Sequence, residues 1–154
     1  MTFGELNAEL QKLVGERVSF VRIVCNSIII YFRGEPADGG VVSVFIDPSW
    51  RFQHHGKVII GSYDLQIEEA DFASKQEYQK EYERIAALTD GLQGSNLEAV
   101  RIDSETSDVE MKFSDDRVVR NFANSALDDK AWTYRNVAKG IAVVVSVFGV
   151  REAK

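Results

Sequence analysis

The sequence predicts an α+β protein of antiparallel β-sheets, built from two similar β units with an N-terminal helix and a central connector helix. Residues 94–122 echo residues 15–45, which is typical of an internal repeat. Short runs of β-branched and aromatic residues recur between turn residues, as in antiparallel strands. Two other segments carry apolar residues at helical spacing. About ten strands and two helices follow, within a single domain that spans residues 1–154.

The two copies of the repeat share residues at matching positions. These positions are Gly15 and Gly94, Val18 and Leu97, Val21-Arg22-Ile23 and Val100-Arg101-Ile102, Phe32 and Phe113, Val41-Val42 and Val118-Val119, and Phe45 and Phe122. Each copy then reaches one of the chain's two tryptophans, Trp50 or Trp132. We interpret the pattern as a duplicated β unit, with a first unit at 14–61, an acidic connector at 63–90 and a second unit at 93–150. The matched places of the tryptophans favour core positions over a binding surface.

An amphipathic helix is predicted at the N-terminus. Thr2 and Glu5 form a capping-box pattern, and Gly15 is well placed to end the helix. One stripe carries the apolar residues, which are Phe3, Leu6, Leu10 and Leu13. The helix should therefore pack against a sheet.

The first unit predicts strands at 18–25, 28–33, 41–46, 50–53 and 57–61. Asn26-Ser27 should form the first turn, which makes Cys25 a small buried residue in a strand. Residues 34–40, GEPADGG, read as a longer loop. His54-His55-Gly56 should turn the last hairpin.

The connector predicts a helix in its second half. Ser74 and Glu77 repeat the capping-box pattern ahead of it. The apolar stripe of this helix consists of Tyr78, Tyr82, Ile85 and Leu88. Because two tyrosines carry polar edges, this helix should lie near solvent.

The second unit predicts strands at 97–103, 109–113, 117–123 and 140–150. In the second of these, alternation places Glu110 and Lys112 on the outer side. The last run is the most apolar of the chain, so we expect a central strand that is covered on both faces.

Charge is unevenly distributed along the chain, whose net charge is −6. Residues 63–90 hold eight acidic and three basic residues, a net charge of −5. Acidity disfavours nucleic-acid binding and favours a basic partner. Arg22 and Arg101 are the candidates for a basic stripe, but the acids that flank them argue against nucleic acid.

Neither a signal peptide nor a membrane helix is predicted. The N-terminus has no basic region, and the longest apolar run, 140–150, is too short to span a bilayer as a helix. With a single cysteine the chain is therefore expected to be cytoplasmic, with no membrane partner.

The sequence contains no recognisable catalytic or cofactor motif, so we expect no enzyme, no catalytic residues and no cofactor. His54 and His55 are adjacent, and in extended structure their side chains would point to opposite faces. The acidic turn of Asp103, Glu105 and Asp108 does not match an EF-hand loop. We therefore expect no metal site.

Leu-x-Gly, Val-Arg-Ile, the segment DVEMKFSDDRVV at 108–119 and a later tryptophan resemble a group of small β-rich bacterial proteins. Some of that group are thought to be immunity proteins encoded beside polymorphic or contact-dependent toxins. The resemblance covers residues 14–150 and implies a stoichiometric binder, without catalytic residues.

The sequence thus predicts a non-enzymatic immunity-type protein that binds a basic toxin domain, with acids steering association and aromatics anchoring it. The candidate partner-binding residues are Asp71, Glu77, Glu81 and Glu83, with Asp103, Glu105 and Asp108 as a second patch. The alternative is a small-molecule-binding or structural β module that uses a cleft between the two units, lined by Trp50 and Trp132. The oligomeric state is left open.

Overall fold

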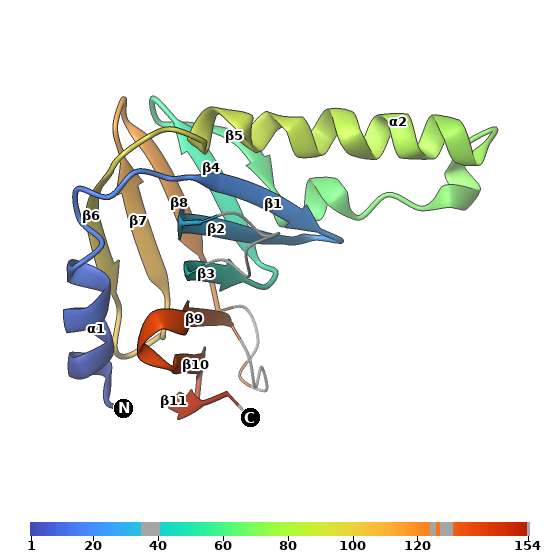
Figure 1. The fold of residues 1–154 in the computed structure, drawn as a ribbon. Coiled ribbons are helices and arrows are strands. Elements are labelled where there is room, and N and C mark those ends of the chain that lie inside the picture. The colour runs from blue at the N-terminus through green and yellow to red at the C-terminus, as the bar shows by residue number, and fades with distance from the viewer. Residues whose placement is uncertain (35–40, 124–125, 127–130, 154) are drawn as a thin grey trace.

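Two antiparallel sheets form the body of the molecule, which confirms the predicted α+β class (Figure 1). The computed structural model describes residues 1–34, 41–123, 126 and 131–153. Over these residues it contains eleven strands and two α-helices. One sheet has the order β1-β2-β3-β9-β10-β11, with β1 at Phe20–Val24, β2 at Ser27–Arg33, β3 at Val42–Ile46, β9 at Trp132–Asn136, β10 at Ile141–Ser146 and β11 at Gly149–Glu152. The other has the order β5-β4-β8-β7-β6, with β5 at Lys57–Gly61, β4 at Trp50–His54, β8 at Arg117–Asn121, β7 at Val109–Phe113 and β6 at Leu97–Ile102.

Each predicted β unit contributes strands to both sheets. The first unit forms β1 to β3 in the six-stranded sheet and then crosses to form β4 and β5 in the five-stranded sheet. The second unit forms β6 to β8 in the five-stranded sheet and then crosses back to form β9 to β11. As a result β3 pairs with β9, and β8 pairs with β4. The two units are therefore intertwined and share one core.

The two units begin side by side. The Gly15 amide donates to the Leu97 carbonyl over 2.7 Å, and the Gly94 amide donates to the Val18 carbonyl over 2.9 Å. Both glycines have left-handed φ angles, +91° and +85°, which residues with a Cβ adopt at a cost. The matched glycines of the repeat thus occupy matched places in the fold.

The predicted alignment of the two repeat copies is wrong by two residues at one place. It matches Val42, in β3 of the first copy, with Val119, in β8 of the second copy. Val44 pairs with Tyr134, two residues after Trp132, and Val119 pairs with Phe52, two residues after Trp50. Val44, not Val42, therefore occupies the place of Val119. A shift of two residues keeps every side chain on its own face, so the alternation of apolar residues could not detect it.

The core lies between the inner faces of the sheets. Trp50 and Trp132 are 2% and 0% exposed, so both are core residues. The Trp50 indole N–H donates to the Asn26 carbonyl in the β1–β2 turn, and the Trp132 indole N–H donates to the Ser107 carbonyl before β7, each over 2.8 Å. Each tryptophan thus fastens the end of a hairpin in the opposite sheet.

Helix α1, at Phe3–Gln11, has the predicted capping box, with Thr2 and Glu5 bonded to each other's backbone amides. Its inward residues Leu6 and Leu10 are fully buried. The Gln11 side chain donates to the Val100 carbonyl of β6 over 2.8 Å. The helix therefore covers the core beside β6, on the left of Figure 1.

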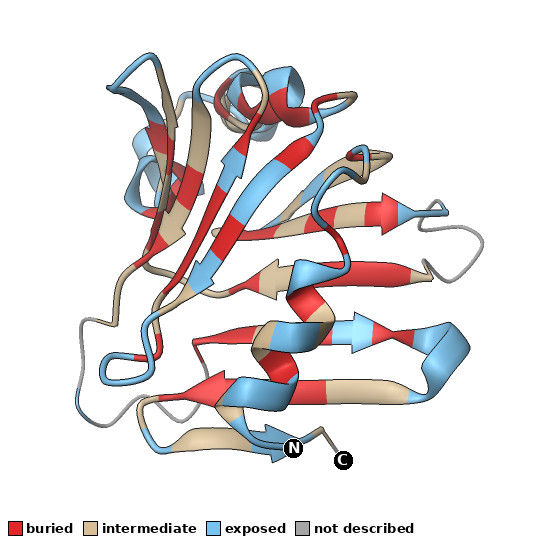
Figure 2. Cartoon of the chain, turned by 90° about the vertical axis from the view of Figure 1, so that its left-hand side faces the viewer, coloured by how far each residue is buried: buried red, intermediate tan, exposed pale blue. Residues whose placement is uncertain are grey.

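The prediction of one central strand at 140–150, covered on both faces, is wrong. Residues 140–150 form two strands, β10 and β11, joined at 147–148, and β10 lies one strand from the sheet edge. Val143 and Val145 are buried while Val144 is only half-buried, so one face is covered more fully than the other. In Figure 2, several strands change between buried and less buried colours along their length. The sequence pattern does not predict the turn at 147–148, because the turn residue Phe148 is apolar although it is 72% exposed.

The environment predicted for Cys25 is also wrong. Val24 pairs with Ser27, so the turn is Cys25-Asn26 and lies one residue earlier than predicted. Cys25 has a φ of 54° and is exposed. Asparagine is the residue type expected in such a turn, but it is Cys25, not Asn26, that adopts the left-handed backbone conformation.

Cys25 is therefore expected to react with a chromogenic disulfide reagent in the folded protein, with one equivalent released per chain. An exposed thiol needs no unfolding to meet the reagent. The rate should be compared in buffer and in urea, with the absorbance of the released thiol as readout. A thiol that reacts only in urea would contradict this placement.

Candidate functional site

The acidic connector forms an arm that projects from the body. It runs from 62 to 92 through η2 at Ser62–Leu65, η3 at Glu69–Asp71, helix α2 at Lys75–Ala86 and η4 at Ala87–Leu92. In Figure 1, α2 extends to the right beyond the sheets, and the preceding segment runs beneath it. Leu65, Ile85 and Leu92 are buried and hold the base of the arm. The rest of this connector, 66–84, is mostly exposed.

Only one half of the capping box predicted for α2 forms at the start of the helix. Ser74 is the N-cap residue, and its hydroxyl accepts from the Glu77 amide over 3.2 Å. The Glu77 carboxylate accepts from the Ala73 amide over 3.3 Å, one residue before the amide that a strict capping box would use. Leu88 lies in η4 and is 40% exposed, so the predicted apolar stripe ends at Ile85.

Aromatic side chains line one side of the arm. Phe72 and Tyr78 meet edge to face with ring centroids 5.8 Å apart, and Tyr78 and Tyr82 follow at 6.5 Å. The Tyr82 hydroxyl donates to the Cys25 carbonyl over 2.8 Å, which ties the arm to the β1–β2 turn. Burial raises the pKa of Tyr82, so this hydroxyl remains a donor.

The predicted acidic residues of the arm differ in how far they are neutralised. Asp71, Glu77 and Glu83 are exposed. Glu81 is half-buried and binds Arg84 through both oxygens, at 2.6 and 2.9 Å, which lowers the pKa of Glu81. Its charge is thus paired within the helix, and the other three carboxylates present most of the predicted negative charge.

The second predicted patch lies elsewhere. Asp103, Glu105 and Asp108 belong to the turn at the far end of β6, six residues of strand away from the arm. Asp103 accepts from the amides of Thr106 and Glu105, and these bonds lower the pKa of Asp103.

The Asp108 carboxylate is likewise engaged by backbone. It accepts from the Ala123 amide over 2.7 Å. The carboxylates of Asp103 and Asp108 therefore accept hydrogen bonds from backbone amides and fix the shape of the loop. The Glu105 carboxylate forms no such bond with the described residues. The two predicted patches do not form one surface.

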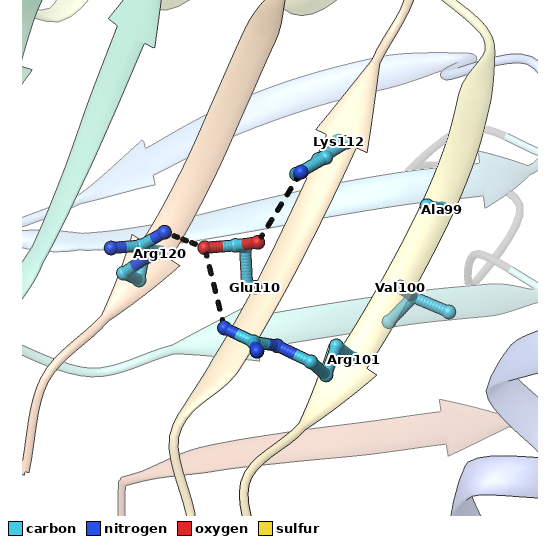
Figure 3. A pocket seen from close by; sticks show the side chains of 6 residues that line it. All are labelled: Ala99, Val100, Arg101, Glu110, Lys112 and Arg120. Atoms are coloured by element: carbon cyan, nitrogen blue, oxygen red, sulfur yellow. Dashed lines mark ion pairs between the residues drawn. The ribbon is translucent and has the colours of Figure 1, made fainter.

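A charged cluster on the outer face of the five-stranded sheet was missed by the sequence reasoning (Figure 3). Glu110 is predicted to face the outer side of β7, and on that side it is only 8% exposed. It forms an ion pair with Arg120 on β8, and its oxygens lie 3.9 Å from Arg101 on β6 and 3.9 Å from Lys112. Three cations thus surround one carboxylate.

The same row of the sheet continues into β4. Arg51 lies opposite Arg120, and its guanidinium stands 4.5 Å from the centroid of the Phe122 ring. A cation over an aromatic face is favourable, which offsets the repulsion between two adjacent arginines. A hollow of about 440 Å³ lies over the cluster, between β6, β7 and β8. This face is cationic although the chain is acidic.

Cross-strand register is the signal that would have found this cluster. The register pairs Glu110 with both Arg101 and Arg120. Arg22, which the sequence aligns with Arg101, lies in the other sheet on β1. The two arginines therefore do not form one basic stripe.

The prediction that His54 and His55 point to opposite faces is wrong. His55 has a φ of 49° and Gly56 a φ of 75°, so the chain leaves extended structure at His55. The two imidazole rings stack with centroids 4.1 Å apart. The alternation rule holds only within a strand, and His55 lies just outside β4.

No protein-family model matches the sequence, and no curated protein and no solved structure matches it either. Within the part of the chain that the structure describes, no helix is both long and apolar enough to cross a membrane.

Proposed function

We propose that this chain is a non-enzymatic protein-binding module that presents its acidic arm to a basic protein partner. The observation that carries the proposal is the arm itself: a connector with a net charge of −5 that leaves the body and exposes Asp71, Glu77 and Glu83. A helix that served only to join β5 to β6 would not need to extend beyond the sheets.

The partner class that we propose is a bacterial toxin domain with a basic active surface, which makes the chain an immunity protein. The negative arm would steer the partner, and charge complementarity raises association rates by about 10- to 1000-fold. The aromatic side of the arm, from Phe72 to Tyr82, offers contacts that exclude water once the partner has docked. Binding alone would block the toxin, so the chain needs no chemistry of its own.

The test begins with capture of the partner. The full-length chain is immobilised, a lysate that contains the product of the neighbouring gene is passed over it, and the purified partner is then used for kinetics. The triple variant Asp71→Asn, Glu77→Gln, Glu83→Gln should associate about tenfold more slowly and with a weaker dependence on salt.

The matched control is Glu105→Gln, which removes a carboxylate from the other acidic patch. It should associate as fast as the original chain, because it lies at the opposite end of β6. If the triple variant keeps the original association rate and salt dependence, the arm is not the docking surface.

A second candidate function is the binding of a small anion on the five-stranded sheet. It is favoured by the hollow in Figure 3, where Arg101, Lys112 and Arg120 outnumber the single carboxylate of Glu110. The alternative site between the tryptophans has no such support, since Trp50 and Trp132 are enclosed. Titration with inorganic phosphate, followed by the side-chain NMR signals of the three cations, distinguishes this candidate from the arm.

A further inference from the structure

Two hairpin turns meet at one end of the five-stranded sheet and bring both histidines of the chain together with an aspartate. His54 ends β4 and pairs with Arg117, the first residue of β8. The His55 amide donates to the Asp116 carbonyl over 3.1 Å, which joins the β4–β5 turn to the β7–β8 turn. His55, Asp115 and Asp116 all have left-handed φ angles, between 49° and 61°. Two tight turns thus fix the backbone under these side chains.

Three ligand atoms converge there. His54 Nε2 lies 3.0 Å from Asp115 Oδ2, and His55 Nε2 lies 3.6 Å from Asp115 Oδ1. The ligand atoms of the three residues all lie within 4.8 Å of one another. Two nitrogens at about 2.1 Å from a tetrahedral zinc ion stand about 3.4 Å apart, so small rotations of these side chains would complete the arrangement.

The surrounding groups fit the second shell of a metal site. Asp116 Oδ2 lies 3.8 Å from His55 Nδ1, the ring nitrogen that would not bind the metal, and a carboxylate there orients the imidazole. Arg117 Nη1 lies 3.2 Å from Asp115 Oδ2, so it holds one carboxylate oxygen and leaves Oδ1 toward His55.

The geometry points to a zinc site formed by His54, His55 and Asp115. Two imidazoles and one carboxylate suit Zn²⁺, whereas Mg²⁺ and Ca²⁺ take oxygen ligands. Three protein ligands leave a fourth position open to water or to a ligand from another molecule. Zinc bound there would link the β4–β5 and β7–β8 turns directly.

Zinc binding can be followed at the histidines themselves, because the chain contains only two. Full-length protein without a histidine tag is titrated with ZnCl₂, and the imidazole NMR signals are recorded. Both histidines should shift together and saturate at one zinc per chain. In parallel the melting temperature of the original protein should rise with zinc.

Variants of the two aspartates test whether Asp115 binds zinc together with the histidines, or whether the two histidines bind it alone. Asp115→Asn keeps the shape of the side chain but loses the anionic ligand. Asp116→Asn, which removes only the carboxylate beside His55, should lower zinc affinity by about 10- to 100-fold, and Asp115→Asn should lower it further. Glu105→Gln should bind as the original does. If Asp115→Asn binds zinc as tightly as the original chain, or if only one histidine shifts, the site is overturned. Neither result depends on capture of a protein partner.

Discussion

Replacing Trp132 by alanine is expected to lower the free energy of unfolding by about 3–5 kcal/mol. The side chain is 0% exposed, so its removal leaves a cavity between the two sheets. It also leaves the Ser107 carbonyl before β7 without its donor. The measurement is urea denaturation followed by far-ultraviolet circular dichroism, which does not depend on tryptophan fluorescence.

Trp132→Phe separates the hydrogen bond from the packing. It keeps much of the ring but removes the indole N–H, and should cost about 1–3 kcal/mol for the buried acceptor that is left unpaired, in addition to some lost packing. Trp50→Phe should show a similar cost, because its N–H donates over the same 2.8 Å to the β1–β2 turn. Phe148→Ala, at a 72% exposed turn position, is the control and should change stability by no more than about 0.5 kcal/mol. Equal values for all three variants would show that the indoles do not fasten the hairpins.

Local signals predicted most elements of this fold. Thr2 and Glu5 placed the start of α1, and Ser74 placed the start of α2, because a cap acts within one turn of helix. Alternation placed most of the strands, but it missed β9 at Trp132–Asn136 and read β10 and β11 as one strand. What it could not give is the crossing of each unit from one sheet to the other, since pairing between β3 and β9 depends on residues about ninety positions apart.

The candidate sites were harder to predict for the same reason. The alternation of apolar and polar residues gives no sign that Glu110 is buried. Only its register with Arg101 and Arg120 shows why it is buried. His54 and Asp115 are 61 residues apart and meet because β4 pairs with β8. The arm is the exception: its charge could be read from the sequence because it lies in one continuous segment.

Replacing Glu110 by alanine is expected to lower the free energy of unfolding by about 3 kcal/mol. Removal of one partner from a buried ion pair costs about 3–5 kcal/mol, and the value should lie at the low end because the Arg120 side chain is 35% exposed. Glu110 is also the only carboxylate that the register places between Arg101 and Arg120, so its loss leaves neighbouring cations that repel one another. Urea denaturation at low salt measures the cost, and added salt should reduce it.

A double-mutant cycle with Arg120→Met tests whether that cost comes from the pair. If Glu110 is buried because of Arg120, the double variant should be more stable than the sum of the single losses predicts, by about 1–3 kcal/mol. Lys112→Met is the matched control, since Lys112 stands 3.9 Å from the same carboxylate but is 58% exposed, and its loss should cost at most about 1 kcal/mol. Additive losses in the cycle would mean that Glu110 is held by the sheet itself, and that the cations of this face are available to an external anion.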